Sequence, residues 1–97
     1  MMQTYTLLFE VMDFLGKKWV APLLLFLLLT EKTNFSKMKK QLRVTSGTLS
    51  SKLKLLEALG LVEKIVIENP RKILYSLTDR GKATSNQLLH FYENLGN

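Results

Sequence analysis

The stretch that decides the fold is NFSKMKKQLRVTSGTLSSKLKLLEALG, residues 34–60, which combines regular apolar spacing with a dense run of bases. In its first part Phe35, Met38 and Leu42 recur at three- and four-residue steps, which predicts one short helix. Asn34 precedes the first of these residues and is a candidate N-cap for that helix. The helix is too short to be stable alone and must pack on its neighbours.

The second part of the stretch predicts another helix, over about residues 45–58. A turn is expected at Arg43-Val44, after which Thr45 or Ser46 supplies the N-cap, and Gly60 marks the C-terminal end. Two helices joined by so short a turn form a helix-turn-helix. The leucines that define the buried face of the second helix are Leu49, Leu53 and Leu56.

Charge is distributed very unevenly along the chain. The 25 residues from Lys32 to Leu56 carry seven bases and no acid, so the segment is +7 in a chain whose net charge is +6. The bases are Lys32, Lys37, Lys39, Lys40, Arg43, Lys52 and Lys54. Because a merely solvated face normally mixes charge signs, this excess favours contact with a polyanion, DNA ahead of RNA or acidic lipid.

The face of the 45–58 helix opposite its leucines is small, polar and basic. At 100° per residue, Gly47, Ser50, Ser51 and Lys54 point away from the core, while Lys52 can lay its stem on protein and send its ammonium to a phosphate. Hydroxyl side chains tolerate close approach to a groove and contact phosphates or base edges. The DNA-contacting residues predicted on the two helices are Lys37, Lys39, Lys40, Arg43, Thr45, Ser46, Thr48, Ser50, Ser51, Lys52 and Lys54.

The period then changes to one typical of strands. Residues 61–67 and 73–77 are rich in β-branched side chains, and the polar segment 68–72 between them predicts a β-hairpin with a basic tip. Arg71 and Lys72 at this tip are predicted to reach a minor groove or its phosphates. The alternative is that both charges only protect a sheet edge.

Apolar stripes at both ends of the chain predict helices that pack on something beyond their own domain. One helix is expected over 4–15 and another from Thr78-Asp79 to Leu95. A second apolar helix is expected to start near Lys17, with Pro22 in or near its first turn. A two-fold homodimer would bury the terminal stripes, so residues 1–15 and 79–97 are expected to contribute to dimerisation. The predicted interface residues are Tyr5, Leu8, Phe9, Met12, Leu88, Phe91, Tyr92 and Leu95.

Composition excludes several classes of protein. Ninety-seven residues form one domain, predicted to be mainly α with a small β-hairpin, and a 46% hydrophobic content is that of a globular protein. No cysteine and a single histidine, His90, argue against disulfides, metal sites, cofactors and a catalytic triad, so no enzyme is expected. The longest apolar stretch, 19–29, is shorter than the roughly 20 residues of a membrane span. Without a signal sequence, a cytoplasmic location is expected.

Several motifs taken in order resemble the HxlR-type winged helix-turn-helix transcriptional regulators, over residues 6–83. They are GKKW at 16–19, FSKM at 35–38, LSSKL at 49–53, LGLV at 59–62 and YSLTDRG at 75–81. The resemblance implies a homodimer that binds a pseudo-palindromic DNA operator and regulates transcription. It places the recognition helix at about 45–58 in the major groove and the wing at about 68–72 on the minor groove or backbone.

Three positions depart from the family's pattern, and one of them is Lys17, which stands where a second glycine is usual. A cysteine that some members use as a sensor is replaced near Thr6, which rules out thiol-based sensing here. Gly47 stands where a larger polar residue is common on the recognition helix, which leaves the operator sequence open. A different class of function stays open as well, namely a winged-helix module that binds an acidic protein through its basic surface and has no preference for a DNA sequence.

Overall fold

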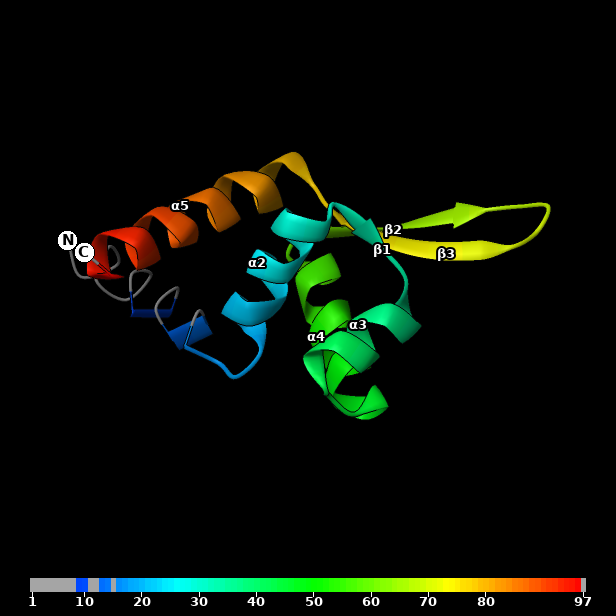
Figure 1. The fold of residues 1–97 in the computed structure, drawn as a ribbon, viewed down its shortest axis with the longest axis horizontal. Coiled ribbons are helices and arrows are strands. Elements are labelled where there is room, and N and C mark those ends of the chain that lie inside the picture. Colours follow the sequence, from blue (N-terminus) through cyan, green and yellow to red (C-terminus); the bar gives the residue numbers. More distant parts are fainter. Residues whose placement is uncertain (1–8, 11–12, 15, 97) are drawn as a thin grey trace.

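The computed structural model describes residues 9–10, 13–14 and 16–96 and shows a winged helix (Figure 1). Helices pack around one end of a small sheet, and a two-stranded hairpin projects from the body. The elements are α2 (Val20–Thr30), β1 (Lys32–Thr33), α3 (Phe35–Leu42), α4 (Ser46–Ala58), β2 (Val62–Ile67), β3 (Lys72–Leu77) and α5 (Asp79–Gly96). The predicted mainly helical fold class is confirmed.

The predicted start of the second helix near Lys17 is wrong by three residues, because α2 begins at Val20. The segment before α2 forms turns, in which the Val20 amide donates a hydrogen bond to the Lys17 carbonyl at 3.2 Å. Trp19 adopts a left-handed conformation, φ 76°, which sets the direction in which α2 leaves this turn. Pro22 lies in the first turn of α2 as expected, where its missing amide costs no helical hydrogen bond.

The α3 helix begins and ends where its local sequence predicts. The Asn34 side chain accepts a hydrogen bond from the Lys37 amide at 2.9 Å, which confirms it as the N-cap. At the other end Arg43 turns the chain with a left-handed backbone, φ 53°, and Val44 inserts into the core at 8% exposure. The anchored Val44 makes the turn between α3 and α4 a fixed corner.

The sheet contains one strand more than the hairpin predicted. Its order is β1-β3-β2 with both pairings antiparallel, and β1 pairs Lys32 with Ser76 and Thr33 with Tyr75. A two-residue strand is too short to show an alternating pattern, so residues 31–34 have the appearance of a polar break in the sequence. In the hairpin Lys72 pairs with Ile67, so the tip is residues 68–71 and Lys72 belongs to β3.

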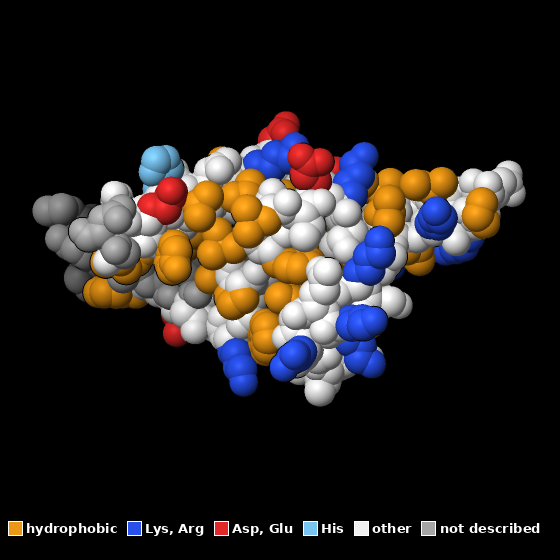
Figure 2. Space-filling view, in the orientation of Figure 1, with side chains coloured by type: hydrophobic (Ala, Val, Ile, Leu, Met, Phe, Trp, Pro, Cys, Tyr) orange, Lys and Arg blue, Asp and Glu red, His pale blue; other side chains and the backbone are white. Residues whose placement is uncertain are grey.

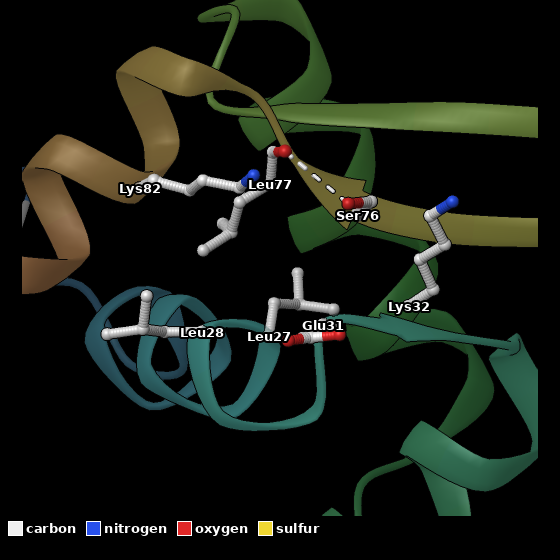
Figure 3. Close-up of a pocket in the computed structure, with 7 residues that line it drawn as sticks. All are labelled: Leu27, Leu28, Glu31, Lys32, Ser76, Leu77 and Lys82. Atoms are coloured by element: carbon white, nitrogen blue, oxygen red, sulfur yellow. Dashed lines mark hydrogen bonds between the residues drawn. The ribbon is translucent and has the colours of Figure 1, made fainter.

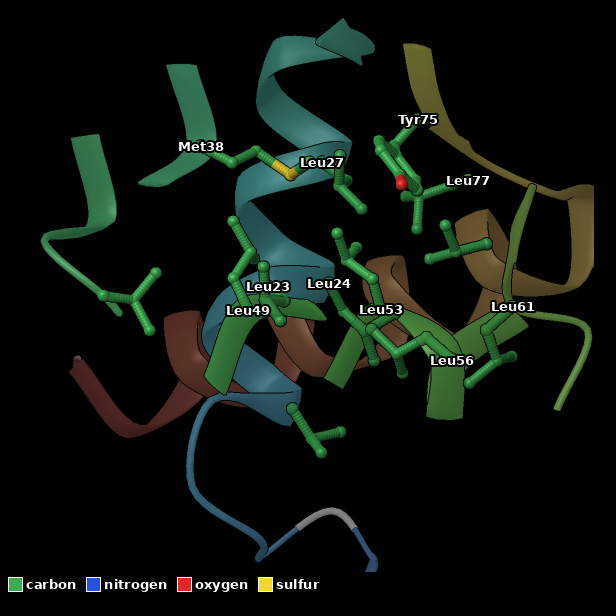
Figure 4. Packing of buried hydrophobic residues seen from close by; sticks show 13 residues of the cluster. Leu23, Leu24, Leu27, Met38, Leu49, Leu53, Leu56, Leu61, Tyr75 and Leu77 are labelled. Carbon is green, nitrogen blue, oxygen red and sulfur yellow. The ribbon is translucent and has the colours of Figure 1, made fainter. Parts of the chain in front are cut away.

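The core lies where α2, α4 and the body end of the sheet meet (Figure 4). Leucines from α2 and α4 interdigitate there, and each fully buried leucine contributes about 1.5–3 kcal/mol relative to an exposed one. The buried hydrophobic residues are Val20, Leu23, Leu24, Leu27, Met38, Val44, Leu49, Leu53, Leu56, Leu61, Val62, Tyr75 and Leu77. Trp19 and Phe14 pack against this cluster, consistent with a role in packing rather than ligand binding.

The start of α5 is locked to the hairpin base by the Thr78 side chain. Its hydroxyl donates to the Gly60 carbonyl at 2.6 Å and accepts from the Gly81 amide at 3.0 Å, which caps the helix. Gly81 is a steric requirement, because a Cβ there would collide with the Leu61 carbonyl oxygen. The chain therefore runs from β3 into α5 through a closely packed junction.

Candidate nucleic-acid interface

The orientation of α4 is set by its buried leucines. Leu49, Leu53 and Leu56 are at most 1% exposed, so the opposite side of the helix faces solvent. Gly47, Ser51 and Lys54 lie on this outer side and are exposed. Thr48, Ser50 and Lys52 lie on its flanks and are half-buried, and Ser46 is exposed because it is the first residue of the helix. All but Gly47 are predicted DNA contacts, and all of them lie on α4 with at least part of the side chain exposed. Whether they touch DNA stays a prediction.

The N-terminus of α4 is built around two threonines. Thr45 Oγ1 accepts from the Thr48 amide at 3.2 Å, and its hydroxyl proton goes to Thr48 Oγ1 at 2.9 Å. Thr45 is therefore the N-cap, of the two candidates Thr45 and Ser46, and its hydroxyl is committed to the helix. The hydroxyl proton of Thr48 remains available to a phosphate oxygen. No acid lies in the first turn of α4, so the positive end of the helix dipole is not neutralised there.

The other predicted phosphate contacts lie beside α4 on α3 and the turn. Lys37, Lys39, Lys40 and Arg43 are all exposed, while Met38 between them is buried and orients the helix. In the space-filling view, blue side chains gather over the lower part of the molecule, where α3 and α4 lie, with no red among them (Figure 2). Here the uniformly basic stretch of sequence folds into a uniformly basic surface.

The hairpin carries a second group of bases, which alternate with the exposed acids Glu63 and Glu68. Arg71 and Lys72 are exposed at and next to its tip, as predicted. Lys64, on β2, is also exposed and is not among the predicted contacts. The apolar residues around Lys64 in the sequence give no sign of a DNA contact there. The hairpin register, in which Lys64 is paired with Tyr75, could have indicated its position. Three bases therefore line the hairpin that projects from the body in Figure 1.

The predicted dimer residues on α5 belong to one stripe that changes from buried to exposed along the helix. Gly81 and Ser85 are buried, Leu88 is half-buried, and Tyr92 and Leu95 are 68% and 71% exposed. From Leu88 onward the stripe lines an apolar groove of about 610 Å³. The residues lining this groove are Gly16, Ala21, Leu25, Leu88, Phe91, Tyr92 and Leu95.

The N-terminal half of the predicted dimer interface is described only in part. Phe9 is helical and 64% exposed. Tyr5, Leu8 and Met12 lie outside the described residues, as does most of the predicted 4–15 helix. Phe9 and the end of α5 thus both present large apolar side chains to solvent.

Other site chemistry is sparse in the described part of the chain. Residues 9–10, 13–14 and 16–96 contain no group of three or more histidine, aspartate or glutamate side chains placed to hold a metal ion. Within the same ranges, no helix combines the length and the hydropathy that crossing a bilayer requires. His90 is exposed on α5.

Comparison with known proteins gives one consistent result. The HxlR-like helix-turn-helix family model matches residues 14–96. The HTH-type transcriptional regulator YvaP of Bacillus subtilis (strain 168) is 47% identical over 76 residues, which are 76% of this chain and 69% of YvaP.

Solved structures agree with this result. A transcriptional regulator homologue from Pyrococcus horikoshii OT3 superposes with a TM-score of 0.75 at 28% identity, over 91% of each chain. The reduced form of the transcriptional regulator YodB from B. subtilis gives a TM-score of 0.76 at 27% identity, over 87% of this chain and 83% of YodB. Given the shared family model, the identity with YvaP and these superpositions, this chain belongs to the HxlR-like helix-turn-helix family of DNA-binding transcriptional regulators, which are not enzymes.

Proposed function

We propose that the protein regulates transcription by binding a specific double-stranded DNA site as a homodimer, with α4 in the major groove. The observation that carries this proposal is the surface of residues 35–56, which spans α3 and most of α4 and carries six bases, no acid and several small hydroxyl residues. Five of these bases are exposed, and Lys52 is half-buried. Lys37, Lys39, Lys40, Arg43 and Lys52 hold phosphates. The base edges are contacted by Lys54 and by the hydroxyls of Ser46, Thr48, Ser50 and Ser51.

In this arrangement the hairpin is the wing. Arg71 and Lys72 contact the minor groove or its phosphates beside the major groove that α4 occupies. The apolar end of α5, with Phe9 and the groove between α2 and α5, forms the two-fold interface. Such an interface places two α4 helices about one helical turn of DNA, or a multiple of it, apart on a pseudo-palindromic site.

The DNA proposal is tested by titrating the protein against a labelled duplex from upstream of its own gene and a scrambled duplex, at several salt concentrations. A regulator should prefer its site by roughly 10³-fold or more, with a steep negative salt slope. If both duplexes bind equally and weakly, a selection from a random DNA library should follow. A selection that also yields no preferred sequence would contradict the proposal and favour the protein-interaction module.

The orientation of α4 is tested with Lys52→Ala/Lys54→Ala. We expect weaker binding to all DNA and a salt slope that is smaller by about one unit for each phosphate that the variant no longer neutralises. The matched control is Lys17→Ala/Lys18→Ala, which removes the same charge from exposed positions before α2. If both double variants lose the same affinity, only net charge matters and the proposed orientation is wrong.

The dimer is tested with Phe91→Ser/Leu95→Ser, measured by sedimentation equilibrium. Both side chains are at least 64% exposed in the single chain, so their loss should leave the fold intact and shift the protein from dimer to monomer. The control, Val66→Ser/Ile67→Ser, removes exposed apolar side chains from the hairpin instead. A wild-type protein that sediments as a monomer, or a dimer unaffected by the α5 substitutions, would contradict this interface.

A further inference from the structure

A second pocket, distinct from both proposed interfaces, lies where β3 runs into α5 and α2 runs into β1 (Figure 3). Its volume is about 380 Å³, within the range of roughly 300–1,000 Å³ in which proteins hold small molecules. The lining residues are Leu27, Leu28, Glu31, Lys32, Ser76, Leu77 and Lys82. The pocket therefore joins three leucines to an acid, two bases and a hydroxyl.

The charges on this pocket are opposite in sign and lie on opposite walls. Glu31 projects from the end of α2, and Lys82 projects from the first turns of α5 across the pocket (Figure 3). Lys32 flanks the strand side, opposite Ser76 in the β1–β3 pairing and so on the same sheet face. In the described part of the chain, none of the three charged groups forms an ion pair, with one another or with other residues.

Two further features indicate that the polar side of the pocket is suited to binding a ligand. Ser76 is 8% exposed, yet its hydroxyl makes only a long contact of 3.4 Å to the neighbouring Leu77 carbonyl, so its hydrogen-bonding capacity is largely unused. Glu31 has φ 67° and ψ −84°, a sparsely populated conformation in which its backbone N–H donates a hydrogen bond to the Leu27 carbonyl at 3.0 Å. Backbone strain of this kind concentrates at ligand sites.

We propose that this pocket binds an α-amino acid with an apolar side chain. The ligand's ammonium pairs with Glu31, and its carboxylate pairs with Lys82, with the Ser76 hydroxyl donating to it from the sheet. Its side chain covers the leucines that form the apolar surface of the pocket. A zwitterion satisfies both charged walls at once, whereas a simple anion would leave Glu31 unpaired and repelled. The ligand would contact both the wing strand and α5.

The test is a titration of the ¹⁵N-labelled full chain, without DNA, followed by amide chemical shifts. L-Leucine and L-phenylalanine are the probes. We expect saturable shifts at the Ser76, Leu77 and Lys82 amides for at least one probe. Glu31→Gln and Lys82→Gln should each weaken binding about tenfold, because each removes one charged hydrogen bond. Lys64→Gln, an exposed base on the opposite face of the sheet, is the matched control and should bind as the wild type does.

4-Methylpentanoate has the carbon skeleton of leucine without the ammonium, and it should bind at least about tenfold more weakly and be indifferent to Glu31→Gln. The proposal is overturned if neither amino acid gives saturable shifts at these amides, if Glu31→Gln and Lys82→Gln bind like Lys64→Gln, or if 4-methylpentanoate binds as well as leucine. Since no DNA is present, failure here is separate from failure of the proposed DNA binding.

Discussion

The helices α4 and α5 have similar apolar spacing, but their apolar stripes differ in how far they are buried. In α4 the stripe of Leu49, Leu53 and Leu56 is completely buried. In α5 the stripe starts buried at Gly81 and Ser85 and ends at Leu95, which is 71% exposed. Burial of the first stripe turns a polar and basic face outward, whereas the second turns large apolar side chains outward.

The difference shows that an apolar period defines a face but not its partner. The α4 stripe meets α2 and the sheet of its own chain, so its outer face is free for an anionic partner. The α5 stripe extends beyond those elements, and its uncovered part matches a surface that a second protein chain covers. The two surfaces therefore predict partners of different chemistry.

The sharpest test of this contrast compares Leu53→Ala with Leu95→Ala. Leu53 is 1% exposed, so its truncation should lower the free energy of unfolding by about 2–5 kcal/mol. For Leu95→Ala the change should stay within about 0.5 kcal/mol under conditions in which the chain is monomeric. Urea denaturation at low protein concentration measures both. Equal losses would show that the end of α5 is packed within the single chain.

The buried start of α5 is tested next with Gly81→Ala. The new methyl group would meet the Leu61 carbonyl, so we expect a loss of about 1–3 kcal/mol in thermal or urea unfolding. Gly47→Ala is the matched control in α4, where a Cβ meets nothing within 4 Å, and it should stabilise the protein by about 0.5–1 kcal/mol. A Gly81→Ala variant as stable as the control would contradict the tight junction.

A smaller and opposite effect is expected at Ser85. Its side chain is fully buried, and its hydroxyl has no hydrogen-bond partner among the described residues. Ser85→Ala removes this unsatisfied group and raises helix propensity, so the free energy of unfolding should rise by about 1 kcal/mol. Calorimetry would detect the increase in Tm. A destabilised variant would mean that the hydroxyl is satisfied in solution.

The smallest effect concerns the contact of α4 with the sheet at alkaline pH. Burial, and then the charge of Glu57 on α4, raise the pKa of Tyr75 above 10.0. The unfolded chain therefore loses this proton first, so the stability that Tyr75 contributes is complete below pH 10.0 and is lost as pH rises through the raised pKa. Tyr75→Phe should flatten the fall of unfolding free energy above about pH 10. An unchanged slope would assign that fall to other groups.

Most of the helix-turn-helix could be predicted from the sequence, because helix caps and apolar periods are signals between residues close together in the chain. The Asn34 and Thr45 caps and the leucine period of α4 lie within a few residues of the features that they determine. Strand β1 and the start of α2 could not be predicted in this way. A two-residue strand exists only because β3 offers it a partner, and the left-handed Trp19 has no sequence signature.

The sequence by itself determined that this chain has a helix pair with a basic stretch, residues 32–56, that contains no acid, together with one hairpin and apolar ends. Composition and period are properties of neighbouring residues, which is why the sequence alone determines them. Only the tertiary structure decided which apolar stripe is core and which stays exposed, and that Glu31, Ser76 and Lys82 meet at one pocket. The physical reason is that burial depends on which segments pack together, and these three residues are up to 51 positions apart in the chain.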